Sequence, residues 1–465
     1  MIKKSFFGLT NNLSRFKYET LDTISGEPEK IPVPKKVTLF LKKPFSLSRS
    51  PGDSLLLNTG DKVKTGQKLA IYKDCDDYVI SSVTGTVASI SGYTGDFGKS
   101  FTAVVIHTDR HTDGDMAENE ETDEQFGNRA GEPTDPDFYW ETVRNFLREV
   151  PGSPCFCAFS DPDKPVKNLV ICGTDRDMLT VTNQYVVTNH TDAVSSGISI
   201  LKKISGADHV IVALPAQLMK SAGGLGGASG VEVRTVRPEY PAASPPMMMK
   251  DLMGEVVPAG KTPQDMGTCF FSAEAVASIG AAFADARIPL TKTLTLIKKD
   301  MTLVVTEARI GTPLSDIFNA CNISVNDGDR IVVGGPMTGA SVYSEDYPVQ
   351  PDTDAVMIQA HDDLSLVSDY PCINCGECVR ICPAGVPVNM LVRFCEAGEY
   401  EDAANLYDLH SCIECGLCSY VCVSKMPVLQ HIRLAKYELA QMAAQEEAAE
   451  AEAEAEAEEE EAGDA

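Results

Sequence analysis

The sequence has no apolar run long enough to cross a membrane. A spanning helix needs about 18 or more mainly apolar residues without charges. The best candidate, Thr268 to Ala284, is shorter and carries Glu274. The stretch from Met1 to Gly8 also lacks the apolar core of a signal peptide. We therefore expect a protein that is made and kept in a reducing cytosol, without a membrane span of its own.

Basic residues are also scarce. Lysine and arginine total 40 against 67 acids, which gives a formal charge of −27 and a pI near 4.6. Nucleic acids and anionic lipids are bound through a basic footprint, so neither is expected as the main partner. Histidine is rare as well, with seven in the chain. His190, His209 and His410 have no metal-binding spacing among them and are interpreted as structural.

The length, in contrast, exceeds what one compact core needs. With roughly 150 residues per domain, a chain of this size predicts two to four domains. The 43% hydrophobic and 23% charged residues are typical of a globular protein. Residues of about 30–108 have the pattern of short β-strands, and 138–345 alternate strands with helices as an α/β domain does. Residues of about 291–335 return to strands, and nine of the 15 cysteines lie between 365 and 440.

Periodicity and charge locate the individual elements. Alternating or short continuous apolar runs predict strands, and a repeat of three to four residues predicts helices. The predicted strands are 36–41, 68–72, 78–83, 103–107, 168–172, 209–214 and 231–236. The predicted helices are 192–203, 273–283, 388–397, 400–407 and 428–443. Between 112 and 137 Arg129 is the only base among many acids, which predicts a solvated linker. The Ala/Glu tail after residue 443 is expected to be an acidic helix or a disordered brush.

A cysteine repeat carries the chemistry. Cys372 to Cys382 and Cys412 to Cys422 superpose after a shift of 40 positions, and both follow the pattern C-x2-C-x2-C-x3-C. This is the spacing of ferredoxins with two [4Fe–4S] clusters. Three cysteines on a tight loop reach three corners of one cubane, and Gly376 or Gly416 lets the backbone bend close to the sulfides. The repeat therefore predicts two [4Fe–4S] clusters.

The ligand set is expected to be crossed, because the fourth cysteine of each run reaches the other cluster in this arrangement. The predicted ligands of the first cluster are Cys372, Cys375, Cys378 and Cys422. Those of the second are Cys412, Cys415, Cys418 and Cys382. The alternatives are a pair of zinc knuckles or a set of buried thiols, but zinc sites generally use separated CxxC pairs. Val423 stands where a second proline would follow the run, which is expected to change only the exit of the chain.

The remaining cysteines share no spacing. Cys395 falls within a predicted helix and is interpreted as a small core residue, not as a ninth ligand. Cys155 and Cys157 are too close in sequence for tandem ligation. The others are likewise expected to be packing or adventitious thiols, namely Cys75, Cys172, Cys269 and Cys321.

In this order, the modules resemble a known family. Gly60 to Leu69, Ser82 to Ile90, Met253 to Gly267, Ile310 to Pro313 and Gly334 to Gly339 precede a cluster repeat that contains Asn374, Glu377 and Glu414. Together they resemble the C subunit of the Rnf ion-translocating ferredoxin:NAD oxidoreductase complex, from about residue 30 to 440. The resemblance implies a multidomain α/β protein. Its first half would contain a barrel-sandwich (lipoyl-like) module at 1–110, an acidic linker at 111–137 and an α/β domain related to the flavin subunit of complex I at 138–290. A soluble-ligand-binding β-grasp module at 291–350, a helical twin [4Fe–4S] ferredoxin domain at 360–443 and an acidic tail at 444–465 would follow.

One region departs from the family. Members bind FMN and NADH on a Gly-Gly-Ala-Gly-Phe-Pro-Thr loop shortly before the strand at 168–172. Arg148 to Asp161 stands there without a glycine cluster, and Pro151 and Pro154 each remove a backbone donor that could hold phosphate. After the strand, Asp175 and Asp177 replace the family's acidic segment and are interpreted as surface turn residues. The glycine run from Gly223 to Gly230 precedes a strand and is interpreted as a flexible crossover. Bound FMN and NADH are therefore not expected.

The resemblance and this departure predict a peripheral electron-transfer subunit of a membrane-bound Rnf-like complex of bacteria. It is expected on the cytoplasmic side of the inner (plasma) membrane, passing electrons through its two clusters to or from flavin- or cluster-bearing and polytopic partner subunits. Ion translocation would occur elsewhere in the complex. No catalytic residue is assigned, and NADH dehydrogenase activity of the chain's own is not expected. Two alternatives stay open, a NADH:ferredoxin oxidoreductase subunit with a rearranged FMN site and an iron–sulfur module of a soluble heterodisulfide-reductase-like complex.

Overall fold

The computed structural model describes residues 16–21, 27–42, 56–73, 77–109, 126, 136–159, 164–219, 225, 230–365, 367–368 and 370–463. The chain forms two compact units. One contains most of the chain up to residue 364, and the other is built mainly from 365 onward. Cys75 and nearly all of the glycine run at 223–230 lie outside the described residues. Within the described part, no helix combines the length and apolar character that a membrane crossing requires.

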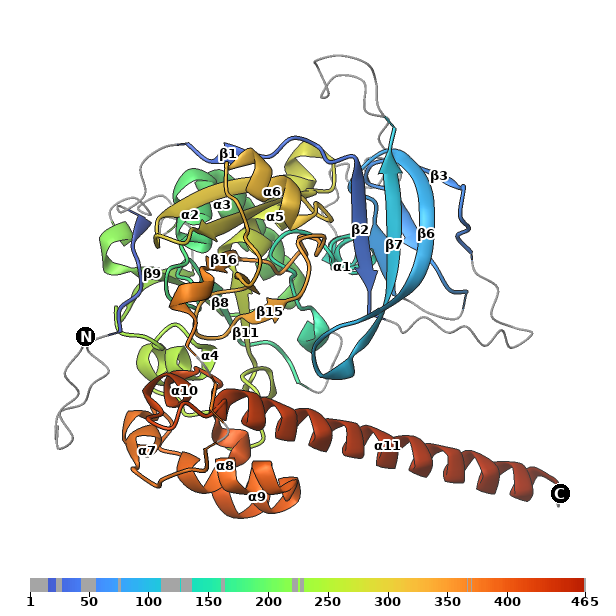
Figure 1. Cartoon of the computed structure of the whole chain (residues 1–465). Coiled ribbons are helices and arrows are strands. Elements are labelled where there is room, and N and C mark those ends of the chain that lie inside the picture. Colours follow the sequence, from blue (N-terminus) through green and yellow to red (C-terminus); the bar gives the residue numbers. More distant parts are fainter. Residues whose placement is uncertain are drawn as a thin grey trace. The chain divides into compact units, whose positions relative to one another are not determined.

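The first module of the larger unit is an antiparallel β-structure (Figure 1). Its main sheet has the order β2 (Lys36–Leu41), β7 (Ser100–Thr108), β6 (Gly85–Thr94) and β3 (Lys62–Val63), beside a hairpin of β4 (Lys68–Ala70) and β5 (Tyr78–Ile80). Along β2, buried Val37, Leu39 and Leu41 alternate with more exposed residues, as a strand with one face on a core requires. The strands predicted here are confirmed.

The central module is a four-stranded parallel sheet. Its order is β10 (Val231–Val236), β9 (His209–Pro215), β8 (Asn168–Cys172) and β11 (Thr268–Ser272). Parallel sheets are covered on both faces, which explains the nearly continuous apolar sequence of β8 and β9. The helices of this module are α1 (Pro136–Phe146), α2 (Thr182–Asn189), α3 (Thr191–Ser205), α4 (Pro245–Met248) with a π-helical turn (Met249–Met253), and α5 (Ala273–Asp285). Helices α3 and α5 approach so closely at Gly280 that a Cβ atom there would lie 1.9 Å from the carbonyl oxygen of Ala193.

A mixed sheet follows. Its order is β1 (Glu29–Lys30), β13 (Leu303–Arg309), β12 (Thr291–Ile297), β16 (Ala355–Gln359), β14 (Arg330–Val333) and β15 (Ala340–Val342), with α6 (Leu314–Ala320) after β13. Strand β1 is parallel to β13, so the segment before the barrel strands pairs outside the barrel. The sequence analysis did not predict β1, β15, β16 or α6 individually, and β16 lies outside the predicted β-grasp module at 291–350. The domain boundaries themselves stay a prediction.

The smaller unit is helical. It contains α7 (Glu377–Ile381), α8 (Val388–Ala397), α9 (Tyr400–Tyr407), α10 (Leu417–Val421) and the long α11 (Val428–Gly463). Its core gathers Leu391, Val392, Leu409 and Ile432, with Cys395 buried among them as predicted. The smaller unit also has a short 3-10 turn at Leu409–Ser411. Those of the larger unit are Asp96–Gly98, Cys157–Phe159, Ala216–Met219, Gln264–Met266 and His361–Asp363.

Candidate metal centre

The two cysteine runs have the same backbone conformation. Asn374 and Glu414 both have a positive φ, at 56° and 54°. Gly376 and Gly416 both have a φ of 73° and stand directly before α7 and α10. A left-handed residue at this point turns the chain sharply from loop into helix, which glycine does without steric cost. The sequence repeat is therefore a structural repeat.

The exit from each run is also the same. Gly385 donates its N–H to the carbonyl of Cys382 at 3.3 Å, and Lys425 donates to that of Cys422 at 3.2 Å. Helices α8 and α11 then begin at Val388 and Val428, again 40 positions apart. The expectation that Val423 changes the exit is wrong. Pro387 and Pro427 precede the two helices at matching positions, and the turn before them does not depend on the residue after the fourth cysteine.

The thiols gather in two groups. Burial raises the pKa of Cys412, Cys415 and Cys418, and the neighbouring Cys382 thiol adds to the rise in each case. Cys382 thus lies near three cysteines that are about thirty or more positions away in sequence. Burial likewise raises the pKa of Cys378 to about 11, with further contributions from Cys372 and Cys375. This grouping is compatible with the crossed ligand set, which stays a prediction.

The donor set suits a cubane better than a single ion. Among the described residues, no three or more His, Cys, Asp or Glu side chains converge as the ligands of one metal ion do. The cysteine ligands of a cubane stand farther apart, because each binds a different iron atom. The first three cysteines of each run are spread over a loop and the start of a short helix, which matches that requirement. The delivery of the fourth thiol from the other run stays a prediction.

Charged groups surround the second run. Glu414 pairs with Arg433 at 3.2 Å and with Lys436 at 2.9 Å, and Lys436 also donates to the carbonyl of Cys412 at 2.7 Å. In the first run, Arg380 donates to the carbonyl of Cys375 at 2.9 Å and pairs with Glu377 at 2.8 Å. The sequence reasoning missed these cations. The 40-position repeat gave no sign of them, because the equivalents of Arg380 and Lys436 in the other half are Tyr420 and Glu396.

The central module places polar groups where open α/β sheets bind ligands. Such ligands lie outside the carboxyl ends of the strands, at the point where the strand order reverses. Here that point is β8, between β9 and β11. The N–H of Asn183 donates to Asp175 at 2.8 Å, and the N–H of Glu274 donates to Asn183 at 3.4 Å. Gly152, in the loop after α1, packs so closely that a Cβ would lie 2.3 Å from the nitrogen of Ala275.

Asp175 and Asp177 are not surface turn residues, and that expectation is wrong. They are 1% and 5% exposed. Asp175 accepts hydrogen bonds from Asn183 and Gln184. Asp177 accepts from the N–H and hydroxyl of Thr338, at 2.7 and 2.6 Å. The partner of Asp177 is about 160 positions away in sequence, so the local pattern of small and charged residues gave no sign of it. A possible signal was the position of both acids, immediately after a fully buried strand.

The segment before the barrel lies along the same edge of the parallel sheet. Tyr18 donates its N–H to the carbonyl of Pro238, and its hydroxyl accepts from the N–H of Ala243, both at 3.0 Å. The side chain of Gln184 donates to the carbonyl of Glu19 at 3.0 Å. Residues 16–21 therefore bridge helix α2 and the loop that follows β10.

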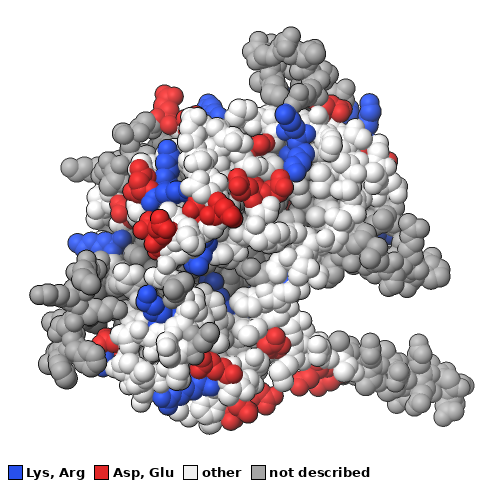
Figure 2. Space-filling model, viewed as in Figure 1, with Lys and Arg blue, Asp and Glu red and all other residues white. Residues whose placement is uncertain are grey.

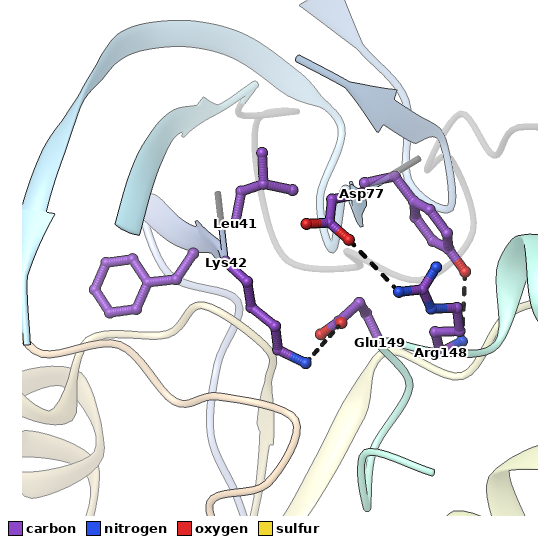
Figure 3. A pocket seen from close by; sticks show the side chains of 7 residues that line it. Leu41, Lys42, Asp77, Arg148 and Glu149 are labelled. Atoms are coloured by element: carbon purple, nitrogen blue, oxygen red, sulfur yellow. Dashed lines mark hydrogen bonds and ion pairs between the residues drawn. The ribbon is translucent and has the colours of Figure 1, made fainter. Parts of the chain in front are cut away.

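A small cleft joins the barrel to the central module (Figure 3). Lys42 and Glu149 form one ion pair, and Asp77 and Arg148 form another, each at 3.5 Å. The hydroxyl of Tyr78 donates to the carbonyl of Arg144 at 3.3 Å. Because these charges pair with each other across the cleft, we interpret it as a structural joint.

The other cysteines differ in exposure. Cys172 and Cys269 are buried in the central module, in agreement with a packing role. Cys155 and Cys157 are exposed, and their sulfur atoms lie 2.6 Å apart. Cys321 is half-buried.

Comparison with known proteins agrees with this architecture. Residues 21–111 match the family described as the RnfC barrel sandwich hybrid domain, and residues 151–281 match the Nuo51 FMN-binding domain. The C subunit of the proton-translocating ferredoxin:NAD(+) oxidoreductase complex of Clostridium ljungdahlii is 28% identical over 468 residues, which cover 96% of both chains. The chain is a homologue of the C subunits of Rnf complexes. The resemblance predicted from the sequence is thereby confirmed.

Other Rnf C subunits match over less of their length. That of the ion-translocating oxidoreductase complex of Pectobacterium carotovorum is 25% identical, over 81% of this chain and 50% of its own. That of the Na(+)-translocating complex of Acetobacterium woodii is 25% identical, over 49% of this chain and 53% of its own. The chain thus spans about half the length of these two relatives. A chain of NAD+-reducing [NiFe]-hydrogenase is 16% identical with a TM-score of 0.41, over 58% of this chain and 51% of that one, which is too low to assign a fold.

The buried Asp175 of this Rnf C homologue predicts a pH-dependent stability. Burial raises the pKa of Asp175 to about 6, and the Asp354 carboxylate adds to the rise. A group whose pKa is higher in the folded state stabilises the fold at low pH, and this stability is lost as the pH rises from about 4 to about 6. We expect Asp175→Asn to remove this dependence. The unfolding free energy of the variant minus that of the wild type should therefore rise by on the order of 1 kcal/mol between pH 5 and pH 7.5.

Urea unfolding at several pH values measures this change. The matched control is the same substitution at an exposed position, Asp285→Asn at the end of α5. A constant difference for Asp175→Asn would contradict the assignment of a raised pKa to this carboxyl.

Proposed function

We propose that this chain is the peripheral electron-transfer subunit of a membrane-bound Rnf-like complex. It relays electrons through two [4Fe–4S] clusters to or from partner redox subunits, on the cytoplasmic side of the inner membrane. The observation that carries the proposal is the twofold structural repeat of the cysteine runs, with Cys382 beside Cys412, Cys415 and Cys418. The names of the relatives, which are subunits of ferredoxin:NAD(+) oxidoreductase complexes, support it.

The chain's own residues hold and orient the clusters. Each run has a left-handed glycine directly before its short helix, and its fourth cysteine caps the end of that helix. In the crossed arrangement this fourth thiol would bind the cluster of the other run. When bound, a [4Fe–4S] cluster stores and releases one electron at a time. Seven of the eight predicted ligand cysteines are half-buried and Cys418 is buried, so clusters held there would lie near the surface of the unit, which suits exchange with a docked partner. The excess of acids, visible as patches of Asp and Glu in Figure 2, does not favour nucleic acid.

A flavin is not part of this proposal. The carboxyl edge of the parallel sheet carries the hydrogen bonds of Asp175, Asn183 and Glu274 and the packed loop at Gly152. The match of residues 151–281 to an FMN-binding domain favours a second candidate, an NADH:ferredoxin oxidoreductase subunit with a rearranged FMN site. In that candidate the loops at this edge would have to open.

Analysis of anaerobically purified protein separates the two candidates. We expect roughly eight iron atoms and eight acid-labile sulfides per chain, as two cubanes require, and no flavin absorbance. Iron near zero would overturn the proposal. Stoichiometric flavin that bleaches with NADH would favour the second candidate.

A further inference from the structure

The central module carries a pair of exposed cysteines outside the cluster unit. Cys155 and Cys157 are free thiols in the loop after α1, and their sulfur atoms lie 2.6 Å apart. The sulfur atoms of a disulfide are about 2.05 Å apart. A small movement of the two side chains would therefore bring them to bonding distance.

The residue between the two cysteines anchors the loop. Phe156 is 7% exposed, and the centroid of its ring lies 6.3 Å from that of Trp140 and 5.9 Å from that of Phe271. Phe156 thus packs into the core of the module, while the cysteines on either side of it remain exposed. Both thiols are accessible to a small molecule from the solvent.

Hydrogen bonds fix the backbone that leads to the pair. The N–H of Gly152 donates to the carbonyl of Pro351 at 2.8 Å, and the hydroxyl of Ser278 donates to the carbonyl of Pro151 at 3.0 Å. Two reacting groups that are held in place react as in a unimolecular step, without the entropy cost of bringing them together. Once one thiol is oxidised, reaction with the other thiol of the pair should outrun reaction with a second external molecule.

A third cysteine lies near the pair but is closed to the solvent. Cys269 on β11 is 3% exposed, and burial raises its pKa to about 12, with further contributions from the thiols of Cys157 and Cys155. Burial and the Cys155 thiol also raise the pKa of Cys157, but the N–H of Ala158 acts against this rise. The nucleophile in thiol chemistry is an accessible thiolate. The exposed pair is therefore the reactive part of this group, and Cys269 is its unreactive neighbour.

We propose that Cys155 and Cys157 form a thiol–disulfide redox site that exchanges two electrons with low-molecular-weight disulfides. One cysteine thiolate attacks a sulfur atom of the disulfide RSSR, which forms a mixed disulfide and expels the first RS−. The other cysteine thiolate attacks the protein sulfur of that mixed disulfide and expels the second RS−. The two protons of the cysteine thiols pass to the two RS−, so that one RSSR becomes two RSH while the cysteines become a disulfide.

This site differs from the predicted clusters in its chemistry. A [4Fe–4S] cluster transfers one electron, whereas the cysteine pair transfers two. Exposed disulfides belong to the labile class that thiols reduce readily, so the oxidation should be reversible. The inference goes beyond the proposed function and does not require either cluster.

Thiol mapping on the full-length protein tests the proposal. The protein is purified anaerobically, equilibrated with reduced and oxidised glutathione, alkylated and digested with trypsin. Cleavage after Arg148 and Lys167 gives a peptide in which Cys155 and Cys157 are the only cysteines. In oxidised glutathione we expect this peptide to lose both alkylatable thiols and two hydrogen atoms without gaining glutathione. An excess of reduced glutathione should restore both thiols.

Dilution of the glutathione mixture identifies a bond within the pair. At a fixed ratio of reduced to oxidised glutathione, tenfold dilution should raise the ratio of disulfide to dithiol about tenfold, because two reduced glutathiones are released per disulfide formed. In Cys157→Ser, Cys155 can form only a mixed disulfide, which releases one, so its modified fraction should not change on dilution. Cys321→Ser is the matched control. It removes a half-buried cysteine on α6's C-terminal side and should leave the titration of the pair unchanged.

Three results would overturn the inference. In the first, the peptide keeps both alkylatable thiols in oxidised glutathione. In the second, both cysteines carry glutathione, or the ratio of oxidised to reduced wild-type peptide does not respond to dilution. In the third, Cys157 is linked to Cys269 instead of Cys155. Iron and acid-labile sulfide are determined separately on the same protein, so a failure of the proposed function is distinguished from a failure of this inference.

Discussion

Replacement of Cys382 by serine is expected to remove the cluster of the second run, although Cys382 belongs to the first run in sequence. About four of roughly eight iron atoms should be lost, because a cubane with one thiolate missing is labile. The reason is spatial. Cys382 lies beside Cys412, Cys415 and Cys418, because its thiol contributes to the raised pKa of each of these three cysteines.

Pairs of variants identify the lost cluster. The residual EPR signal of Cys382→Ser should match that of Cys415→Ser, and the signal of Cys422→Ser should match that of Cys375→Ser. If Cys382→Ser instead matches Cys375→Ser, each run binds its own cluster and the crossed ligand set is wrong. Cys395→Ser is the control. Cys395 is buried in the same core but is not a predicted ligand, so its replacement should leave the iron content unchanged.

The parts of the fold that were predicted from sequence have local causes. The strand of residues 168–172 is an uninterrupted apolar run, and its boundaries agree with those of β8. The helix at 273–283 has an apolar face, and Ser272 caps it by accepting a hydrogen bond from the N–H of Ala275. The cysteine repeat follows from spacing alone. The strand, the helix and each single cysteine run are complete within about fifteen residues, so distant contacts are not needed to see them.

The features that were missed depend on distant contacts. Asp177 is buried because the loop of Met337 and Thr338, about 160 positions away, donates hydrogen bonds to its carboxylate. Strand β1 is short and gains its partner only from β13. A single sequence indicates which residues favour a turn or an exposed position. It does not indicate which segment will later cover them.

Lys292 is the second site with a large expected effect. It is fully buried on β12, and its ammonium donates to Glu274 at the start of α5, to Asp354 before β16 at 3.0 Å and to the carbonyl of Thr293 at 2.8 Å. Burial would lower the pKa of Lys292, but the carboxylates of Glu274 and Asp354 outweigh it and raise the pKa to about 12. The charged lysine thus connects the parallel sheet module with the mixed sheet.

Lys292→Met should lower the unfolding free energy by about 3–5 kcal/mol, because it leaves the Glu274 carboxylate buried without its partner. Urea unfolding followed by the fluorescence of Trp140, the single tryptophan, measures the loss. Lys36→Met is the matched control. Lys36 and Asp346 form an exposed pair with 46% and 68% of their side chains accessible, so its removal should change stability by less than about 1 kcal/mol.

A double variant distinguishes the loss of an attraction from the cost of a stranded charge. In Lys292→Met with Glu274→Met, both buried charges are replaced by apolar side chains of similar length, and Asp354 is 36% exposed and can be hydrated. Replacing a whole buried pair is often neutral, whereas removing one member is not. We therefore expect the double variant to recover most of the stability lost by Lys292→Met. If it is as unstable as the single variant, the lysine stabilises the junction through its own packing and hydrogen bonds, and the charge of Glu274 is not the cause of the loss.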